Sequence, residues 1–483
     1  MKRTFCLILA FLFLSGCAQQ SQTEHEQEII RGPTGQLLDS LLTPYVGDLR
    51  ARTDNDAGLA IGVTQGSDIV YAKSFGYADV AQQRPVTLTT KFHIASLSKP
   101  FVAVAALKLA EQGRLDLDAP IRTYVPELSE EKRAFGEVTV RQILTHTSGI
   151  PRHISVDDWL NPVTGSDALE QNLVALGGFS LVSEPGNQYS YSNAAFDVLG
   201  LIISRIVEGS FFEFVEQEVF APIGMANSTY IKTEDGVPAG WANAHAYGLT
   251  TQVLTPYPYN LMIAPSSSVK ATITDMSRWA LFHLEKGTVD GRQVLRGDLY
   301  ETLVTPQYET PWGQHIGLSW YLQEYLGRPI IMHTGESHGF ESIIYIYPEE
   351  DLSIVILANR SGSRTGRLVN ATSEILFGEE PKAYQVSAIY PYTEAYRAGG
   401  RERANELWGE MLPDTTDAFY ADEYDLLASA AILENGAHWK ESQDLLEFYL
   451  GRNANSTYAW RLLGNARLNL GDTAQAIASY ERT

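Results

Sequence analysis

Three pairs of a serine and a lysine three residues later could carry chemistry in this chain. On a helix, residues three apart share a face, so an amine can lie beside a hydroxyl and accept its proton. A lysine acts as a base only when it is neutral, which requires burial or nearby positive charge. The surrounding sequence must therefore decide between the pairs, which are Ser96/Lys99, Ser129/Lys132 and Ser267/Lys270.

Only the first pair lies in an apolar context. Ser96 stands between two apolar runs, whereas Ser129 lies in a charged run and Ser267 in a serine cluster with no apolar helix around it. A lysine in a charged run stays solvated and protonated. We therefore predict that Lys99 is the one buried lysine of the three and that Ser96 is a nucleophile.

A second serine, Ser337, competes for this role. Residues 335–339 fit the Gly-x-Ser-x-Gly elbow of α/β-hydrolases, which needs a strand before the serine and a helix after it. Residues 340–347 have a β pattern instead, and the only histidine after His338 is His438, in a helical segment. We therefore favour Ser96.

Composition limits the classes of function. With 483 residues the chain should form two or three folded units, and 44% hydrophobic residues suffice for a large core. The formal charge of −22 argues against nucleic-acid binding, which needs a basic surface. The sequence contains no His-Glu-x-x-His, phosphate loop or Gly-x-Gly-x-x-Gly, so we expect neither a metal site nor a cofactor.

The first residues predict export. A basic start, Met1 to Arg3, precedes an apolar run that is too short to span a bilayer. The ending Leu14–Cys17 resembles the bacterial lipobox, which implies a lipoprotein signal peptide over 1–17 and lipidation of Cys17. We expect a protein held in the cell envelope by its lipid anchor only and facing the periplasm. Ala18 after the cysteine favours the outer membrane.

Patterns along the chain predict four further segments. Residues 18–36 are polar and read as a tether. From 37 to 377, a β-hairpin (59–64 and 68–75) and strands over 317–323, 329–334, 340–347 and 352–358 enclose a helical centre. This order predicts an α+β fold with an antiparallel sheet flanked by helices. A linker over 378–391 then leads to an all-helical region over 392–483.

The helical region has the spacing of tetratricopeptide helix pairs. One period of about 34 residues upstream, residues 426–450 give a looser version with Gly436 at the turn. We predict helical-hairpin repeats that could bind a protein partner; the alternative is a helical cap on the preceding domain. The matching positions are Trp460, Leu463, Gly464, Gly471, Ala476 and Tyr480.

Three motifs, in the right order, resemble those of the serine β-lactamase-related family, which includes class C β-lactamases, penicillin-binding proteins and esterases. They are Ser96-Leu97-Ser98-Lys99, Tyr191-Ser192-Asn193 and His333-Thr334-Gly335. Further segments that resemble the family are Leu144 to Ile150, Pro222 to Met225 and Thr274 to Met276. The resemblance extends from about Leu41 to Asn359 and implies that family's α+β fold.

The resemblance also implies roles for individual residues. Ser96 would attack the acyl carbon and form an acyl-enzyme, while Lys99 and Tyr191 would share the proton transfers. Asn193 would hydrogen-bond Lys99 and a substrate amide. His333, Thr334 and Gly335 would lie on a strand beside the site. The backbone N–H groups of Ser96 and Glu336 would form an oxyanion hole.

His333 departs from the family's pattern, because β-lactamases and many penicillin-binding proteins have a lysine there. A histidine is mostly neutral near pH 7, so it supplies no permanent charge for a substrate carboxylate. This departure favours an esterase or peptidase over an efficient β-lactamase. A replacement charge could come from Arg360, Arg364 or Arg367. We expect His146 to be structural, and either cleft or core positions for Trp159, Trp241, Trp312 and Trp320.

The sequence therefore predicts an exported serine hydrolase that cleaves an ester or amide of a small-molecule or peptide acyl substrate through a Ser96 acyl-enzyme. One alternative is a β-lactamase or D-Ala-D-Ala-type peptidase proper. Another is a catalytically silent protein that binds a partner through its helical repeats. The intact set of Ser96, Lys99, Tyr191 and Asn193 speaks against the silent protein.

Overall fold

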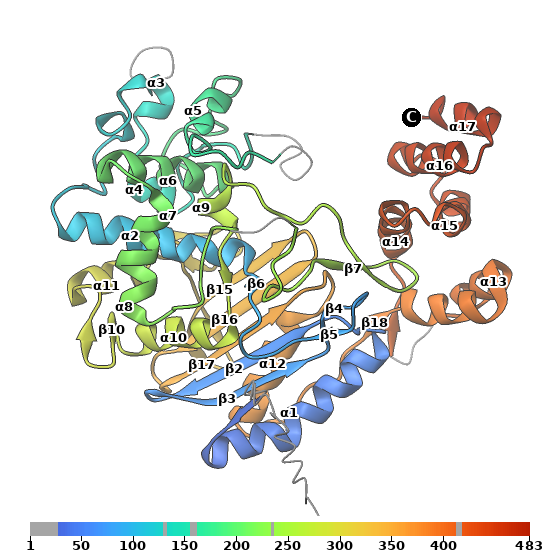
Figure 1. Cartoon of the computed structure of the whole chain (residues 1–483), viewed down its shortest axis with the longest axis horizontal. Helices are drawn as coiled ribbons and strands as arrows, with labels where there is room; N and C mark the ends of the chain where they lie inside the picture. Colours follow the sequence, from blue (N-terminus) through green and yellow to red (C-terminus); the bar gives the residue numbers. More distant parts are fainter. Residues whose placement is uncertain (1–27, 129–132, 155–161, 233–235, 412–417) are drawn as a thin grey trace, which may run out of the picture.

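The computed structural model describes residues 28–128, 133–154, 162–232, 236–411 and 418–483. Its centre is an antiparallel sheet of nine strands in the order β1-β3-β2-β17-β16-β15-β14-β13-β12 (Figure 1). These are β1 (Glu28–Ile30), β2 (Leu59–Gln65), β3 (Asp68–Phe75), β12 (Tyr308–Glu309), β13 (His315–Ile316), β14 (Tyr321–Tyr325), β15 (Arg328–Ser337), β16 (Phe340–Tyr347) and β17 (Leu352–Ala358). The predicted α+β fold is confirmed.

The two ends of the domain meet where β2 pairs with β17, from Leu59 opposite Ala358 to Gln65 opposite Leu352. All seven residues of β17 are buried, because helices cover both faces of the sheet. Val355 lies in the larger hydrophobic cluster and its neighbour Ile354 in the smaller one, as the alternation of side chains along a strand requires.

Two helices cover the face with the smaller cluster, namely α1 (Gly32–Arg52) and α12 (Thr365–Leu376). The other face carries α2 (Lys99–Glu111), α3 (Arg133–Gly136), α4 (Val140–Leu144), α5 (Gln171–Leu176), α6 (Asn193–Val207), α7 (Phe211–Val215), α8 (Ala221–Ile223), α9 (Ala264–Ser267), α10 (Ile273–Leu284) and α11 (Gly297–Val304). Short strands connect them: β4 (Tyr77–Asp79), β5 (Arg84–Pro85), β6 (Phe92–His93), β7 (His245–Tyr247), β8 (Thr251–Val253), β9 (Lys270–Ala271), β10 (Thr288–Val289) and β11 (Arg292–Gln293).

The folded domain begins earlier than predicted, within the tether that we expected over residues 18–36. Residues 28–30 form β1, which pairs with β3. Helix α1 begins at Gly32 and has Pro33 in its first turn, where the missing N–H of proline costs no helical hydrogen bond. The predicted signal peptide over 1–17, with Cys17, lies outside the described residues. Of the helices within the described ranges, none has the length and apolarity to cross a membrane.

One strand starts later than the sequence predicts. We expected a strand from Gly317 to Gln323, but β14 starts at Tyr321. Ser319 has a left-handed backbone, with φ of 72°, and Gly317 N–H donates to the carbonyl of Trp320. Residues 317–320 therefore form the turn between β13 and β14, and strand pairing resumes at Tyr321. The predicted hairpin of β2 and β3 is confirmed.

The C-terminal region is helical, as predicted, with each helix packed against the next from α14 onward (Figure 1). A Cβ at Gly464 would lie 2.3 Å from the ring of Tyr480, so this glycine lets α16 and α17 approach closely. That these pairs are tetratricopeptide repeats stays a prediction. The helices are α13 (Ile389–Met411), α14 (Glu423–Asn435), α15 (Trp439–Arg452), α16 (Thr457–Asn469) and α17 (Thr473–Tyr480).

The predicted linker over 378–391 is not a free connection at its far end. Residues 386–389 are buried: β18 (Val386–Ser387) pairs with β19 (Phe419–Tyr420), and Ile389 packs in one cluster with Tyr247 of the preceding domain and with the tail helices. Arg360 strengthens this junction, since its buried guanidinium donates to the hydroxyl of Tyr390 over 3.0 Å. The described part of the tail, residues 386–411 and 418–483, therefore packs against the preceding α+β domain, which is called the catalytic domain below after its predicted role.

Candidate active site

Ser96 and Lys99 lie on one continuous helical turn. The short 3₁₀ turn η1 (Ala95–Ser98) runs directly into α2, and Lys99 is the first residue of that helix. Their side chains therefore share a face, and the Lys99 Nζ to Ser96 Oγ distance is 3.2 Å. Ser96 lines a pocket of about 260 Å³, together with Tyr191, His333, Thr334 and Glu336 among others.

Lys99 is fully buried, and its Nζ has three hydrogen-bond partners. Besides Ser96 Oγ, Nζ donates to Asn193 Oδ1 over 2.7 Å and to the carbonyl of Ser266 over 2.9 Å. Asn193 is the first residue of α6, where the Ser192 side chain caps the helix. Ser266 is held in turn by Asp197 of the same helix. Partners from three elements, η1, α6 and α9, thus surround the amine that α2 carries.

The ring of Tyr191 forms a side of the site. Its centroid lies 4.8 Å from Lys99 Nζ, and the ring of His146 packs against it at 4.2 Å. Between these described residues, no hydrogen bond joins the Tyr191 hydroxyl to Ser96 or Lys99. Burial and the nearby charge of Lys99 hold the pKa of His146 well below its usual value, so His146 is neutral and packs as a structural residue.

His333 lies on β15 and is buried. Burial, together with the charge of Lys99, lowers its pKa to about 3. Its Nδ1 lies 2.6 Å from the carbonyl oxygen of Thr334. A histidine with so low a pKa is neutral across the physiological range, so it cannot serve as a cationic anchor for a substrate carboxylate.

Gly335 allows β15 to approach the nucleophile turn. A Cβ at this position would lie 2.2 Å from the carbonyl oxygen of Ile94 and 2.3 Å from Ser342 Oγ. Its neighbours Thr334 and Glu336 are exposed and line the pocket. β14 pairs with β15 only as far as Met332, so in the described part of the chain no strand covers that edge over residues 333–337.

None of the three arginines that we considered as a replacement charge lines this pocket. Arg360 is buried beneath the tail, Arg364 donates to Tyr420, and Arg367 donates to Tyr45 over 2.9 Å and to Glu374. These arginines follow β17 in the sequence, and that position did not place them at the Ser96 pocket. This expectation was wrong.

Arg152 is the arginine at the site, and the sequence reasoning missed it. Its guanidinium carbon lies 5.0 Å from the ring centroid of Tyr191, and its side chain is exposed at the pocket. The carbonyl of Arg152 accepts from Asn193 N over 3.0 Å, which ties its loop to the start of α6. The signal in the sequence was its place directly after the family-like segment 144–150.

Aromatic side chains complete the pocket. The hydroxyls of Tyr189 and Tyr321 lie 2.5 Å apart, and Trp312 covers them with 71% of its side chain exposed. Neither tyrosine was singled out from the sequence. Trp241 and Trp320 are buried, and Trp159 lies outside the described residues.

Lys99 is not the only buried lysine of the three pairs. Lys270 is fully buried as well, with Nζ 4.9 Å from the ring centroid of Tyr259, and it has no hydrogen-bond partner among the described residues. The prediction failed because the chain leaves α9 after Ser267 and enters β9 at Lys270, where tertiary packing buries the lysine. Ser267 Oγ bonds the carbonyl of Ile263 instead. Ser129 and Lys132 lie outside the described residues.

The competing nucleophile elbow is absent. Ser337 ends β15 and pairs directly with Phe340 of β16, so a hairpin turn stands where a strand-to-helix turn would be needed. The prediction that Ser337 is not a nucleophile of this type is confirmed.

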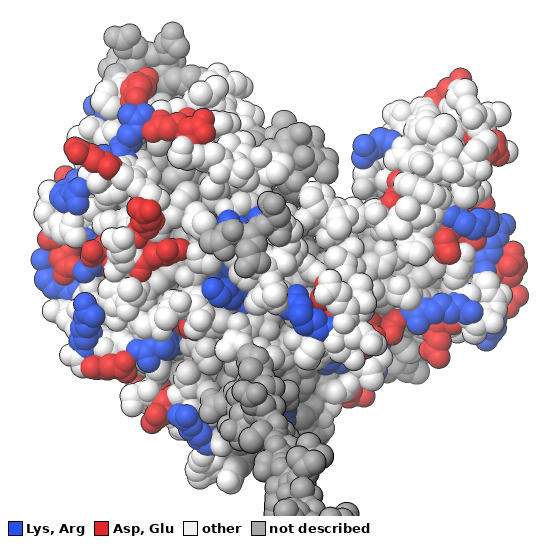
Figure 2. Space-filling view, viewed as in Figure 1, with Lys and Arg blue, Asp and Glu red and all other residues white. Residues whose placement is uncertain are grey.

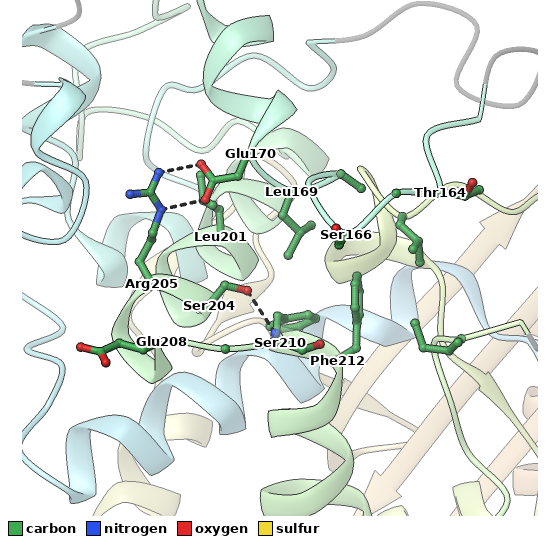
Figure 3. Close-up of a pocket in the computed structure, with 16 residues that line it drawn as sticks. Thr164, Ser166, Leu169, Glu170, Leu201, Ser204, Arg205, Glu208, Ser210 and Phe212 are labelled. Carbon is green, nitrogen blue, oxygen red and sulfur yellow. Dashed lines mark hydrogen bonds and ion pairs between the residues drawn. The ribbon is translucent and has the colours of Figure 1, made fainter.

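A larger hollow of about 650 Å³ lies at the end of α6, away from Ser96 (Figure 3). Figure 3 shows Arg205 turned toward Glu170, to which it forms an ion pair of 2.6 Å. The charge of this arginine is therefore already matched, and none of the predicted site residues lines this hollow. Within the described ranges, no group of three His, Cys, Asp or Glu side chains could hold a metal ion.

Comparisons with known proteins agree with this geometry. Residues 46–378 match the family model described as Beta-lactamase. Protein flp of Staphylococcus aureus (strain N315) is 26% identical over 347 residues, which cover 70% of this chain and 67% of flp. Penicillin-binding protein 4* of Bacillus subtilis (strain 168) is 27% identical, over 65% of this chain and 71% of that protein.

Among solved structures, the octameric penicillin-binding protein homologue from Pyrococcus abyssi is similar, with a TM-score of 0.63 and 25% identity. The similarity covers 74% of this chain and 80% of that one. The family match ends before the tail helices, so the resemblance predicted from the three motifs is confirmed for the α+β domain.

We predict that Lys270→Met stabilises the protein most at low pH. Burial lowers the pKa of Lys270 from 10.5 to about 7, so between those values the unfolded chain binds more protons and wild-type stability rises with pH. The variant removes a penalty that is complete below about pH 7. Its melting temperature should exceed that of wild type at about pH 6, and the difference should shrink toward about pH 10.

Lys382→Met is the matched control, since Lys382 is exposed. Thermal unfolding of wild type and both variants across this range measures the effect. A difference that is equal at all pH values would contradict a lowered pKa for Lys270.

Proposed function

Because the chain belongs to the beta-lactamase family, we propose that it is a serine acyl-hydrolase that cleaves an ester or amide through an acyl-enzyme on Ser96. The observation that carries the proposal is the buried Lys99 amine, 3.2 Å from the Ser96 hydroxyl. Its two other partners, Asn193 Oδ1 and the Ser266 carbonyl, are neutral groups that hold the amine beside Ser96.

This geometry and the resemblance to the family support the following reaction. Ser96 Oγ attacks the acyl carbon while its proton passes to the Lys99 amine, and the resulting oxyanion is stabilised by the backbone N–H groups of Ser96 and Glu336. The bond to the leaving group then breaks as that group takes up the proton, with Tyr191 sharing in the transfer. Water hydrolyses the acyl-enzyme and restores the Ser96 hydroxyl.

The substrate preference follows from the charges at the pocket. His333 is neutral at physiological pH, so it does not provide the fixed charge that a lysine would provide at this point. Arg152 is an exposed cation beside Tyr191 and can take that role. We therefore propose an esterase or peptidase, with Arg152 binding an acidic group of the substrate.

We further propose that the protein is a lipoprotein anchored at Cys17 and facing the periplasm. The basic residues Lys2 and Arg3, the apolar run after them and the ending Leu14–Cys17 support this proposal.

Labelling of Ser96 tests the proposed reaction. A fluorophosphonate should add its phosphonyl group to the wild-type chain from residue 18 onward, detected by intact mass, and should fail to label Ser96→Ala. A stable penicillin adduct on the same serine would indicate a peptidoglycan peptidase; its absence would indicate an esterase, an aminopeptidase or a lactamase with fast turnover. If neither reagent labels folded protein, the chain is a binding protein and the proposal is wrong.

Substitution of Arg152 tests the preference for acidic substrates. Arg152→Gln should lower kcat/KM for an ester with a free carboxylate by about tenfold, because a charge-assisted contact is lost, and should leave a neutral ester of equal length nearly unchanged. Arg292→Gln is the matched control, since Arg292 is exposed and does not line the pocket. The preference should stay constant between about pH 5 and 8; a loss with a midpoint near 6.5 would show that His333 is the anchor instead.

Substitution of the lipidation residue tests the anchor. Cys17→Ser should move the protein from the membrane fraction to the soluble periplasmic fraction and remove the mass of the attached lipid. Unchanged membrane association of the variant would refute a lipid anchor at this residue.

A further inference from the structure

A second hollow, of about 590 Å³, lies between the catalytic domain and the tail. We call it the interdomain cleft; its lining includes Tyr247, Gly339 and Arg364 from the catalytic domain and Tyr424, Leu427 and Tyr458 from the tail. Figure 2 shows the notch between the two lobes, and Figure 1 shows α14 beside β7. Glu336 lines both this cleft and the Ser96 pocket, so the two adjoin at this residue.

The interdomain cleft has fixed walls. Tyr247 packs in one hydrophobic cluster with Leu426 and Leu427 of α14. On the tail side, Arg397 Nε donates to the carbonyl of Leu249 in the catalytic domain over 2.9 Å. Because a shared core and hydrogen bonds hold the two parts together, a ligand pays no cost for closing them, and the cleft is preformed.

The uncovered edge of β15 leads into this cleft. In the described part of the chain, no strand pairs with that edge over residues 333–337, and the next two residues, His338 and Gly339, line the cleft. A strand edge offers alternating N–H and C=O groups, which an extended peptide can pair by adding a strand. A chain bound along β15 beside Ser96 is therefore directed past Glu336 toward the tail.

The tail presents aromatic side chains at the far side of the cleft. Tyr424 of α14 is 66% exposed and Tyr458 of α16 is 45% exposed, although both are large and mostly apolar. Leu427 and Ile432 add apolar surface beside them. Exposed tyrosines of this kind suit the side chains and amide groups of a peptide, since the ring is apolar and the hydroxyl can form hydrogen bonds.

We propose that the substrate is an extended peptide, whose reacting carbonyl lies at Ser96 and whose further residues run along β15 past Glu336 to Tyr424 and Tyr458. The tail then serves as a substrate-binding part of the enzyme. This inference rests on the proposed reaction at Ser96, and it assigns the interdomain cleft, which that reaction does not need.

A covalent probe tests the path of the chain. The probe is a fluorophosphonate that carries an extended peptide with a benzophenone at its far end. The peptide is attached either to the carbon substituent or to the alkoxy substituent of phosphorus. The probe reacts with Ser96 by forming a P–O bond and releasing fluoride. Irradiation of the labelled full chain should then cross-link the benzophenone to residues 418–469 of the tail, located by peptide mass spectrometry. Labelling without any cross-link to the tail would overturn the inference and leave the reaction intact; failure to label Ser96 would overturn both.

Labelling rates provide the matched measurement. The double variant Tyr424→Ala/Tyr458→Ala should react with the peptide-bearing probe about threefold to tenfold more slowly, because two aromatic contacts are lost, and with ethyl fluorophosphonate at the wild-type rate. Leu470→Ala/Ile477→Ala removes comparably exposed apolar side chains of the tail outside the cleft and should change neither rate. Equal rates for wild type and the tyrosine variant with the long probe would overturn the inference.

Discussion

The burial of the Lys99 amine is the constraint on which the site depends. A buried ammonium or amine without partners is costly, so its donors must be matched by acceptors. Here the acceptors come from η1, from the start of α6 and from the carbonyl of Ser266, which are far apart in the sequence. The helices on this face of the sheet are therefore arranged so that their ends meet at one nitrogen, and Ser96 lies beside it as a consequence.

The sheet supplies the other wall of the site through a close contact between backbones. At Gly335 there is no room for a side chain, because the Ile94 carbonyl and Ser342 Oγ already fill that space. Along one edge β15 pairs with β16, whereas along the other edge β14 pairs with it only as far as Met332. The same arrangement leaves an edge of β15 uncovered directly next to the nucleophile.

The sequence predicted those parts of the molecule that local pattern controls. The strands β16 and β17 were placed to the residue, because long apolar runs between turns permit one interpretation. Ser96 and Lys99 were correctly predicted to be neighbours, because residues three positions apart on a helix share a face. Asn193 was placed next to Lys99 only through the resemblance to a known family.

What the sequence did not predict depends on contacts between distant segments. Lys270 stands in a polar stretch, yet packing against Trp241 and Tyr259 buries it. Arg152 reaches the pocket because its loop is tied to α6, and a single sequence carries no sign of that tie. The end of the predicted linker is buried because it shares a core with Tyr247.

The early start of the fold limits how far the folded domain can lie from the proposed anchor. Because β1 begins at Glu28, only residues 18–27 separate the proposed anchor at Cys17 from the folded domain. Ten residues span at most about 35 Å when fully extended. If Cys17 carries the lipid, the catalytic domain therefore stays in a thin layer at the membrane surface, where it samples molecules that are attached to the membrane or concentrated there more often than those in the open compartment.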